Sequence, residues 1–115
     1  MKRELKLVKL ILEKIEEDEE LKPKEIILDD YSQEQISYHV NLLEEADYLT
    51  IFTETNNIPY VSHLTWDGHE FLDGLRNDTV MNKVKQKFGD NLSFIPFETL
   101  KILILESAKI VFSES

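Results

Sequence analysis

Apolar residues near the start of the chain recur at the three- and four-residue spacing of a helix that buries one face. The pattern predicts a helix from Glu4 to about Glu17. Its apolar stripe consists of Leu5, Leu7, Val8, Ile11, Leu12 and Ile15. The acidic run 16–20 ends this helix, and clustered carboxylates are unfavourable at the negative end of a helix dipole. We therefore expect this end to fray into solvent, before a turn at Lys22 and Pro23.

A second helix is expected from Gln33 to Ala46. Ser32 and Gln35 have the spacing of a capping box, in which each side chain accepts a hydrogen bond from the other residue's backbone N–H. Apolar residues then repeat at helical spacing, at Ile36, Val40, Leu42, Leu43 and Ala46. The apolar run 25–28 before the box is too short for a stable helix, so we interpret it as a strand or an extended lead-in.

Two segments rich in β-branched and aromatic residues, 48–54 and 59–64, lie on either side of the turn-forming pair Asn56 and Asn57. Strand-forming residues around such a turn are typical of a two-stranded hairpin. We therefore predict a hairpin here.

Three further elements follow the hairpin. Thr65 has a suitable N-cap side chain for a helix that continues to Leu75. The pair 77–78 then interrupts the apolar pattern, which resumes and ends at Phe88. A loop over 89–93 is expected to lead to the last element.

The last element is predicted to be a helix from about Pro96 to Phe112, since proline suits the first helical position. One broad face is apolar and consists of Phe97, Leu100, Leu103, Ile104, Ala108 and Val111. Ile102, Leu105 and Phe112 fall among charged residues on the other side. Because one contact cannot bury apolar residues on both sides, these three residues are the candidate protein interface.

The order helix, short strand, helix, hairpin, helix is that of a winged-helix domain. We therefore predict an α+β, mostly helical fold: a winged helix with a two-stranded wing and an added C-terminal helix. Residues 1–90 would form the winged-helix domain, and residues 91–115 would pack on it or mediate dimerisation. A chain of 115 residues can bury a single hydrophobic core, so we expect one domain overall.

The composition excludes several kinds of site. The chain contains no cysteine, so it has no disulfide, no thiolate metal site and no thiol nucleophile, and a reducing compartment is permitted. Lys6 and Lys9 interrupt the first apolar stretch, which argues against a signal peptide or a membrane span. We therefore expect a cytoplasmic protein.

Three stretches of the sequence resemble one family in particular. They are KRELKLVKLIL at the start, YSQEQISYHVNLLEEADYL in the middle and LTWDGHEFLDGLRNDTVMNKVK after the hairpin. Together they are similar, over nearly the whole chain, to the uncharacterised bacterial and phage family known as domain of unknown function 2513. The resemblance implies a winged-helix fold, is compatible with a phage or mobile-element origin, and implies no activity, because the family has none established.

Asp47 departs from the pattern of this family. Similar sequences usually have Gly at this position, at the end of the second helix. Asp tolerates the left-handed backbone conformation better than most residues, so we expect the turn to be retained.

The charge of the chain argues against DNA binding. The formal net charge is -10 at pH 7, and residues 25–75 contain no Lys or Arg. That span contains eleven acidic residues: Glu25, Asp29, Asp30, Glu34, Glu44, Glu45, Asp47, Glu54, Asp67, Glu70 and Asp73. The helix and hairpin that would contact DNA lie in it, so the phosphate contacts that supply most of the affinity would be missing. The segment before the second helix is also too short for the helix that normally braces a recognition helix.

A transcriptional regulator that binds DNA weakly or through a partner is nevertheless the alternative hypothesis. Lysine and arginine in the first helix would pair with phosphates, while amide and hydroxyl groups in the second would contact base edges. The candidate contacts are Lys2, Arg3, Lys6, Lys9, Gln33, Ser37 and Asn41.

The candidate catalytic and metal-binding patterns are weak. The HEFLD motif departs from the zinc-protease pattern H-E-x-x-H at Asp73, so we interpret His69 as a helix residue bonded near the hairpin and Glu70 as solvated. His39 is expected to be satisfied by backbone groups, and no spacing requires it to share a metal with His63 and His69. The chain also lacks a G-x-S-x-G elbow and a Gly-rich phosphate loop. We therefore predict a non-catalytic protein without metal or cofactor.

Trp66 directly follows the predicted hairpin. We expect its side chain to pin the hairpin to the following helix as a packing contact. The alternative is an exposed anchor at a protein interface, because tryptophan is enriched in binding hot spots.

The leading functional hypothesis is a protein-interaction module that associates through the helix 97–112. A protein partner or self-association is favoured over nucleic acid, and no membrane or small molecule is indicated. The alternative for the helix is that the segment 81–88 covers it. A third hypothesis is mimicry of nucleic acid by the acidic span 25–73, which would compete for a basic protein; a solvated acidic surface explains the same charges.

Overall fold

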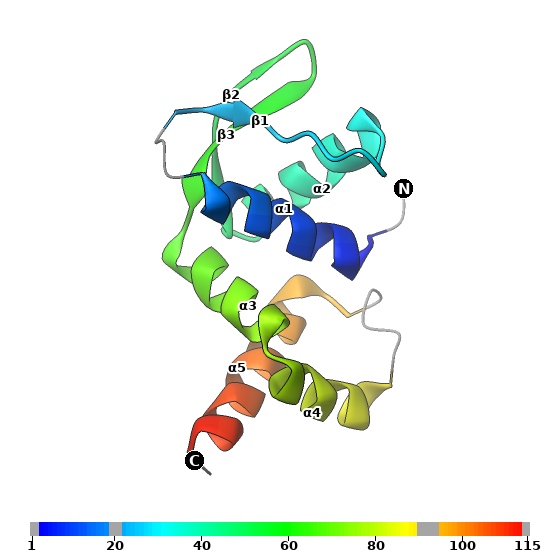
Figure 1. Cartoon of the computed structure of the whole chain (residues 1–115), viewed down its shortest axis with the longest axis vertical. Helices are drawn as coiled ribbons and strands as arrows, with labels where there is room; N and C mark the ends of the chain where they lie inside the picture. The colour runs from blue at the N-terminus through cyan, green and yellow to red at the C-terminus, as the bar shows by residue number, and fades with distance from the viewer. Residues whose placement is uncertain (1–2, 19–21, 90–94, 114–115) are drawn as a thin grey trace.

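The computed structural model describes residues 3–18, 22–89 and 95–113, and within these ranges it contains five helices and one three-stranded antiparallel sheet (Figure 1). The fold is therefore α+β and mostly helical, as predicted. In chain order the elements are α1 (Leu5–Glu17), β1 (Lys24–Glu25), α2 (Gln33–Glu45), β2 (Leu49–Thr55), β3 (Ile58–Leu64), α3 (Trp66–Arg76), α4 (Asp78–Phe88) and α5 (Phe97–Ser113).

The sheet has the strand order β1-β3-β2, and its main part is the predicted hairpin of β2 and β3. Asn56 and Asn57 connect the two strands with φ angles of 54° and 67°. Two consecutive positive φ angles are typical of the type I′ turn, whose twist matches that of the strands. The edge strand β1 is shorter than expected, since only Lys24 and Glu25 pair with β3. Ile26 leaves the strand to enter the core.

Side-chain caps fix where the helices begin. The capping box of Ser32 and Gln35 is present, with both hydrogen bonds formed at 3.0 and 3.1 Å. The hydroxyl of Thr65 accepts a hydrogen bond from the N–H of Gly68 at 3.0 Å. Asn77 ends α3 and caps α4, because its side-chain oxygen accepts from the N–H of Val80. The predicted caps at Ser32 and Thr65 are confirmed, and the predicted break at Asn77 is itself a cap.

The turn between α2 and β2 also has the predicted conformation. Asp47 adopts a φ of 65°, the left-handed region that favours glycine. Its carbonyl oxygen accepts a hydrogen bond from the hydroxyl of Thr65, at the start of α3. Asp47 therefore replaces glycine here without loss of the turn.

α3 lies at the centre of the molecule. In Figure 1, α1, α2 and the sheet are on one side of it, and α4 and α5 are on the other. Tyr48, at the start of the hairpin, is fully buried, and its ring stacks on that of Phe71 in α3, with 4.6 Å between the ring centroids. The core therefore continues from the sheet through α3 to α4 and α5.

Two glycines let α3 approach its neighbours closely. A Cβ at Gly68 would overlap the backbone carbonyl of Tyr48, and a Cβ at Gly74 would overlap the side chain of Ile104 in α5. The first obstacle is main chain and cannot rotate away, whereas the second is a side chain. Gly68 therefore sets the distance between α3 and the start of the hairpin.

We predict that Gly68→Ala lowers the free energy of unfolding by about 1–3 kcal/mol, the usual cost of overpacking a well-packed site. The direction of the change distinguishes a crowded glycine from an unconstrained one. In an unconstrained helix interior, Gly→Ala raises the free energy of unfolding by about 1 kcal/mol. Urea unfolding followed by circular dichroism measures the difference. An increase in stability would show that α3 does not contact the Tyr48 backbone.

Candidate functional site

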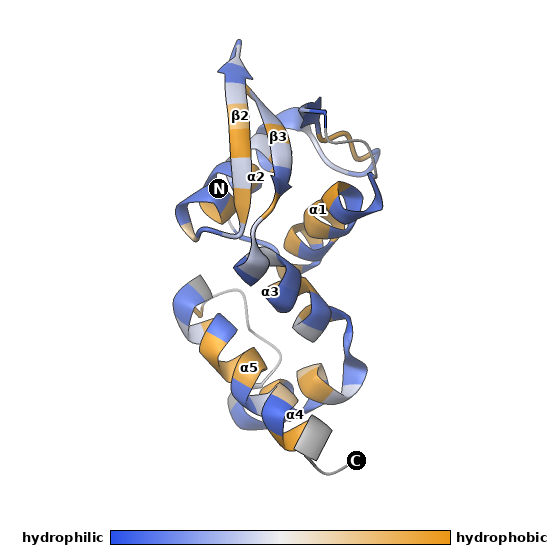
Figure 2. Cartoon of the chain, turned by 90° about the vertical axis from the view of Figure 1, so that its left-hand side faces the viewer, coloured by the Kyte–Doolittle hydropathy of each residue, from blue (hydrophilic) through white to orange (hydrophobic). Residues whose placement is uncertain are grey.

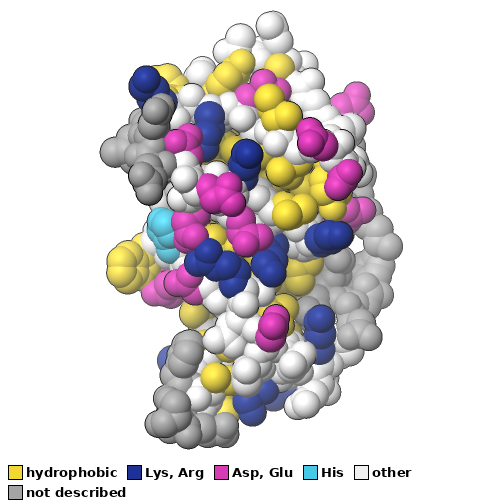
Figure 3. All heavy atoms as spheres, in the orientation of Figure 1, with side chains coloured by type: hydrophobic (Ala, Val, Ile, Leu, Met, Phe, Trp, Pro, Cys, Tyr) yellow, Lys and Arg dark blue, Asp and Glu magenta, His cyan; other side chains and the backbone are white. Residues whose placement is uncertain are grey.

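A groove lined by residues of α3, α4 and α5 is the first candidate site, and we call it the α3–α5 groove. Its volume is about 200 Å³, and its lining consists of Glu70, Asp73, Gly74, Asn77, Val80, Ile104, Leu105 and Ala108. On the left side of the face shown in Figure 3, the outline of the molecule is indented between the start of α3 and the C-terminal half of α5. Apolar side chains form the floor of the groove, and the polar residues come from α3 and its C-cap. Such a groove suits an apolar side chain of a binding partner.

Trp66 lies beside this groove, and the prediction that it packs between hairpin and helix is wrong. Its side chain is 78% exposed. The indole Nε1–H donates a hydrogen bond to Oε1 of Glu70, a groove residue, at 2.5 Å. The aromatic contact between the start of the hairpin and α3 is made instead by Tyr48, which is buried and stacks on Phe71. The alternative, an exposed aromatic side chain, is the one observed.

α5 borders the groove and carries the candidate interface residues. Ile102 is 54% exposed, and Leu105 is half-buried in the groove wall. The side chain of Phe112 lies outside what the structure describes. Ile110, which the sequence pattern did not single out, is 40% exposed. Figure 2 shows orange, hydrophobic positions along much of α5, with blue positions between them.

The opposite side of α5 packs on the rest of the protein. Leu100 and Ile104 are buried, as the predicted broad apolar face requires. Leu103, Ala108 and Val111 are partly buried against the same core. Both α4 and α3 contact α5, so the alternative in which the segment 81–88 covers the helix describes only part of the cover. It does not account for Ile102 and Ile110.

The charged residues in the described lining of the groove are acidic. Glu70 and Asp73 belong to the described lining, which contains no Lys or Arg. The carboxylate of Asp73 pairs with Arg76 at 2.7 Å. Nearby, Asp67 pairs with Lys101 of α5 at 2.6 Å, which ties the start of α3 to α5. The apolar lining is thus bordered by two carboxylates, Glu70 hydrogen-bonded to Trp66 and Asp73 paired with Arg76.

A second groove lies between α1 and α4, and we call it the α1–α4 groove. Its volume is about 250 Å³, and its lining consists of Leu5, Lys6, Lys9, Leu75, Asp78, Met81 and Lys85. Lys6 and Lys9, two predicted nucleic-acid contacts, thus face Lys85 of α4. No local sequence pattern indicates Lys85, because only the tertiary fold brings α4 near α1. Of the other predicted basic contacts, Arg3 is half-buried and Lys2 lies outside the described residues.

The predicted contacts of α2 lie elsewhere. Gln33 and Ser37 line a shallow recess with residues of β1 and β3, including Glu25. The side chain of Asn41 donates to the carbonyl of Ser37 at 2.8 Å and is therefore engaged within its own helix. The recess shares no lining residue with the α1–α4 groove. The structure therefore does not bring the two sets of predicted DNA contacts together.

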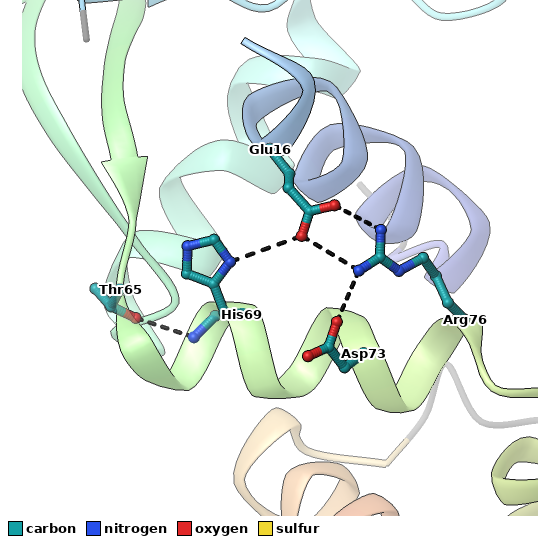
Figure 4. A network of polar contacts seen from close by, with 6 residues as sticks. Glu16, Thr65, His69, Asp73 and Arg76 are labelled. Atoms are coloured by element: carbon teal, nitrogen blue, oxygen red, sulfur yellow. Dashed lines mark hydrogen bonds and ion pairs between the residues drawn. The ribbon is translucent and has the colours of Figure 1, made fainter. Parts of the chain in front are cut away.

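His69 and Glu16 belong to a polar network that joins α1 to α3 (Figure 4). The two guanidinium nitrogens of Arg76 donate to the two carboxylate oxygens of Glu16 at 2.6 and 3.2 Å, and His69 Nδ1 lies 3.7 Å from the same carboxylate. These hydrogen bonds, with that to Asp73, raise the pKa of Arg76. We expect the acidic run 16–20 to fray into solvent, and this is wrong for its first residue, Glu16. A bidentate pair holds it in α1.

The remaining candidate ligands do not form a metal site. Within the ranges that the structure describes, no three His, Asp or Glu residues lie close enough together to hold a metal ion. His63 is exposed and interacts with the neighbouring Ser62. Among the same residues, no helix combines the length and apolar character needed to cross a membrane.

His39 is buried and bonded to the backbone on both ring nitrogens, as predicted. Nε2 accepts from the N–H of Glu4 at 2.9 Å, so the ring proton resides on Nδ1, which lies 2.7 Å from the carbonyl oxygen of Gln35. The ring therefore joins the start of α1 to α2. Burial lowers the pKa of His39 below its ordinary 6.5, against smaller opposing effects of the Gln35 carbonyl and the Glu4 charge. Protonation would also remove the acceptor that Glu4 uses.

We predict that the free energy of unfolding falls as the pH is lowered through 6.5, the ordinary pKa of histidine, and continues to fall towards the lowered folded pKa. Above 6.5 the neutral ring favours neither state, whereas below it the unfolded chain binds the proton first. Urea unfolding at about pH 7.5 and about pH 5.5 measures this loss. This loss of stability should be smaller in His39→Gln than in the unsubstituted protein. It should be unchanged in His63→Gln, because His63 is exposed. Equal pH dependence in all three proteins would contradict the assignment.

Comparison with known sequences supports the resemblance noted above. Residues 2–93 match the family described as hypothetical protein (DUF2513). An uncharacterized protein of Haemophilus influenzae is 37% identical over 92 residues, covering 74% of this chain and 76% of that protein. No solved structure matches the chain significantly.

Proposed function

This chain belongs to the family of hypothetical proteins DUF2513, and we propose that it is a winged-helix module that binds a basic segment of another protein in its α3–α5 groove. The module is non-catalytic. Trp66 carries this proposal, because a 78% exposed tryptophan stands beside an apolar groove and is oriented by a groove residue.

The order of the elements supports the winged-helix assignment. A helix, a short strand, a helix, a hairpin and a helix follow one another, and the short strand pairs with the second hairpin strand. One feature differs from DNA-binding winged helices: residues 22–32 contain β1 and a turn closed by Tyr31 N–H and Leu28 C=O, without a helix to brace α2. The element order supports a winged-helix scaffold, and the missing brace argues against α2 as a recognition helix.

Exposed apolar side chains support a protein partner. Trp66, Ile102 and Ile110 are large and at least 40% exposed, and Leu105 completes the groove between α3 and α5. Tryptophan is among the residues that dominate binding energy at protein interfaces. Its hydrogen bond to Glu70 limits the rotation of the indole before binding, which reduces the entropy lost on association.

Charge identifies the chemistry of the partner. The carboxylates of Glu70 and Asp73 border the groove, and the whole chain carries a net charge of -10. Like charge disfavours a second copy of this chain, whereas lysine or arginine beside an apolar anchor would complement the groove. The occupant is therefore a segment with an apolar side chain for the floor and basic side chains for the edge.

We predict that a synthetic amphipathic helix with leucines on one face and lysines on the other binds the full chain. The same peptide with glutamates in place of lysines should bind at least about tenfold more weakly. Trp66 is the single tryptophan of the chain, so its fluorescence should shift to shorter wavelength as the peptide covers it. Anisotropy of the labelled peptide gives the affinity of each variant.

Matched variants test the location. Trp66→Ala should weaken binding about tenfold or more, as expected for a hot spot. Phe52→Ala removes an aromatic side chain of similar exposure, 69%, on the hairpin, and should leave the affinity unchanged. Equal effects of the two substitutions, or no binding of the lysine peptide, would refute the proposal. So would a Trp66-dependent dimer in light scattering, because the occupant would then be a second copy.

A further inference from the structure

The α1–α4 groove gathers positive charge in a strongly acidic protein. Its described lining contains Lys6, Lys9 and Lys85 and one acidic residue, Asp78. The three lysines come from both walls, two from α1 and one from α4. Within the described part of the chain, none of them forms an ion pair, whereas Lys24 and Lys101 do. In Figure 3, dark-blue side chains lie above and below a yellow strip at the right, where α1 and α4 face each other.

We propose that this groove binds a nucleotide, with the phosphates between the lysines and the base or sugar on the apolar floor. Convergent lysines from two walls attract a ligand that carries several negative charges on a small group. A phosphate chain has that property, and ammonium groups bind it as point charges without the planar fork that arginine offers to carboxylates.

The floor of the groove identifies the rest of the ligand. Leu5, Leu75 and Met81 are the apolar residues of the lining; Leu5 is half-buried, and the edges of the largely buried Leu75 and Met81 reach the groove. An inorganic anion would leave this surface in contact with water, whereas a flat base would cover it. The carboxylate of Asp78 can accept a hydrogen bond from a sugar hydroxyl, as acidic residues do in other nucleotide sites.

Duplex DNA fits this site less well than a single nucleotide unit. The lysines flank a groove between two helices, whereas the phosphates of a duplex lie on a convex surface. Residues 25–75, which include the hairpin, offer no Lys or Arg to a second strand. The nucleotide unit can be free or part of a single strand, and the ligands below distinguish these sources.

Met81 provides a reporter on the floor of the groove. The chain contains two methionines, Met1 and Met81, so methyl-labelled methionine gives few signals, and Met81→Leu assigns them. The full chain is titrated with adenosine triphosphate, inorganic tripolyphosphate and a six-nucleotide oligothymidylate. We expect the triphosphate nucleotide to shift the Met81 methyl signal and to bind more tightly than tripolyphosphate, with an affinity that falls as salt rises. Tighter binding of the oligonucleotide would assign the site to single strands, and tighter binding of the free nucleotide to a metabolite.

Paired lysine variants test whether binding is local. Lys6→Gln, Lys9→Gln and Lys85→Gln should each weaken nucleotide binding about threefold or more, the effect of losing one exposed charge contact. Lys14→Gln in α1 and Lys87→Gln in α4 make the same change of charge on exposed residues outside the groove, and should leave affinity unchanged. Equal losses in both sets would refute the site. Equal affinities for nucleotide and tripolyphosphate, or no shift of Met81 with either nucleotide ligand, would also overturn the proposal.

Discussion

The contact between α3 and the backbone of Tyr48 determines how the two sides of the molecule fit together. Gly68 permits it, since any larger residue would meet the Tyr48 carbonyl, and the Tyr48 ring then stacks on Phe71 one turn along α3. On the other side of the helix, Gly74 allows Ile104 of α5 to approach equally closely. A displaced α3 would move α1, the hairpin, α4 and α5 relative to one another, because it touches all of them.

Both grooves depend on this position of α3. Gly74 lines the α3–α5 groove and the next residue, Leu75, lines the α1–α4 groove, because successive residues of a helix point about 100° apart. The chemistry of the two grooves is opposite: Glu70 and Asp73 border one, while three lysines border the other. A small acidic domain therefore has one surface suited to a basic protein segment and another suited to a phosphate-bearing ligand.

The secondary structure could be predicted because its signals are local. The capping box at Ser32, the cap at Thr65, the Asn56-Asn57 turn and the break at Asn77 each act over about four residues, and each is present. The site could be predicted only in part, because local sequence patterns do not predict which helices become neighbours. Lys85 comes to line the same groove as Lys6 and Lys9 only because α3 contacts both α1 and α4.

The errors have the same origin. Trp66 was expected to pin the hairpin to the following helix because it lies between them in the sequence, but its side chain is exposed, and Tyr48 makes that contact by stacking on Phe71. Glu16 was expected to fray because of its neighbours in sequence, but Arg76, sixty residues away, binds its carboxylate. Which aromatic side chain is buried, and which residues far apart in the sequence form an ion pair, both depend on the tertiary fold. Residue spacing alone does not predict either.

A single titration can establish whether the two surfaces bind their ligands separately. In protein labelled at both the Trp66 indole and the methionine methyls, the lysine-rich amphipathic peptide should shift the Trp66 signal and leave Met81 unchanged. Adenosine triphosphate should shift Met81 and leave Trp66 unchanged. If either ligand shifted both signals together, or if each shifted the signal assigned to the other, the division of the surface by α3 into two sites of opposite charge would be wrong.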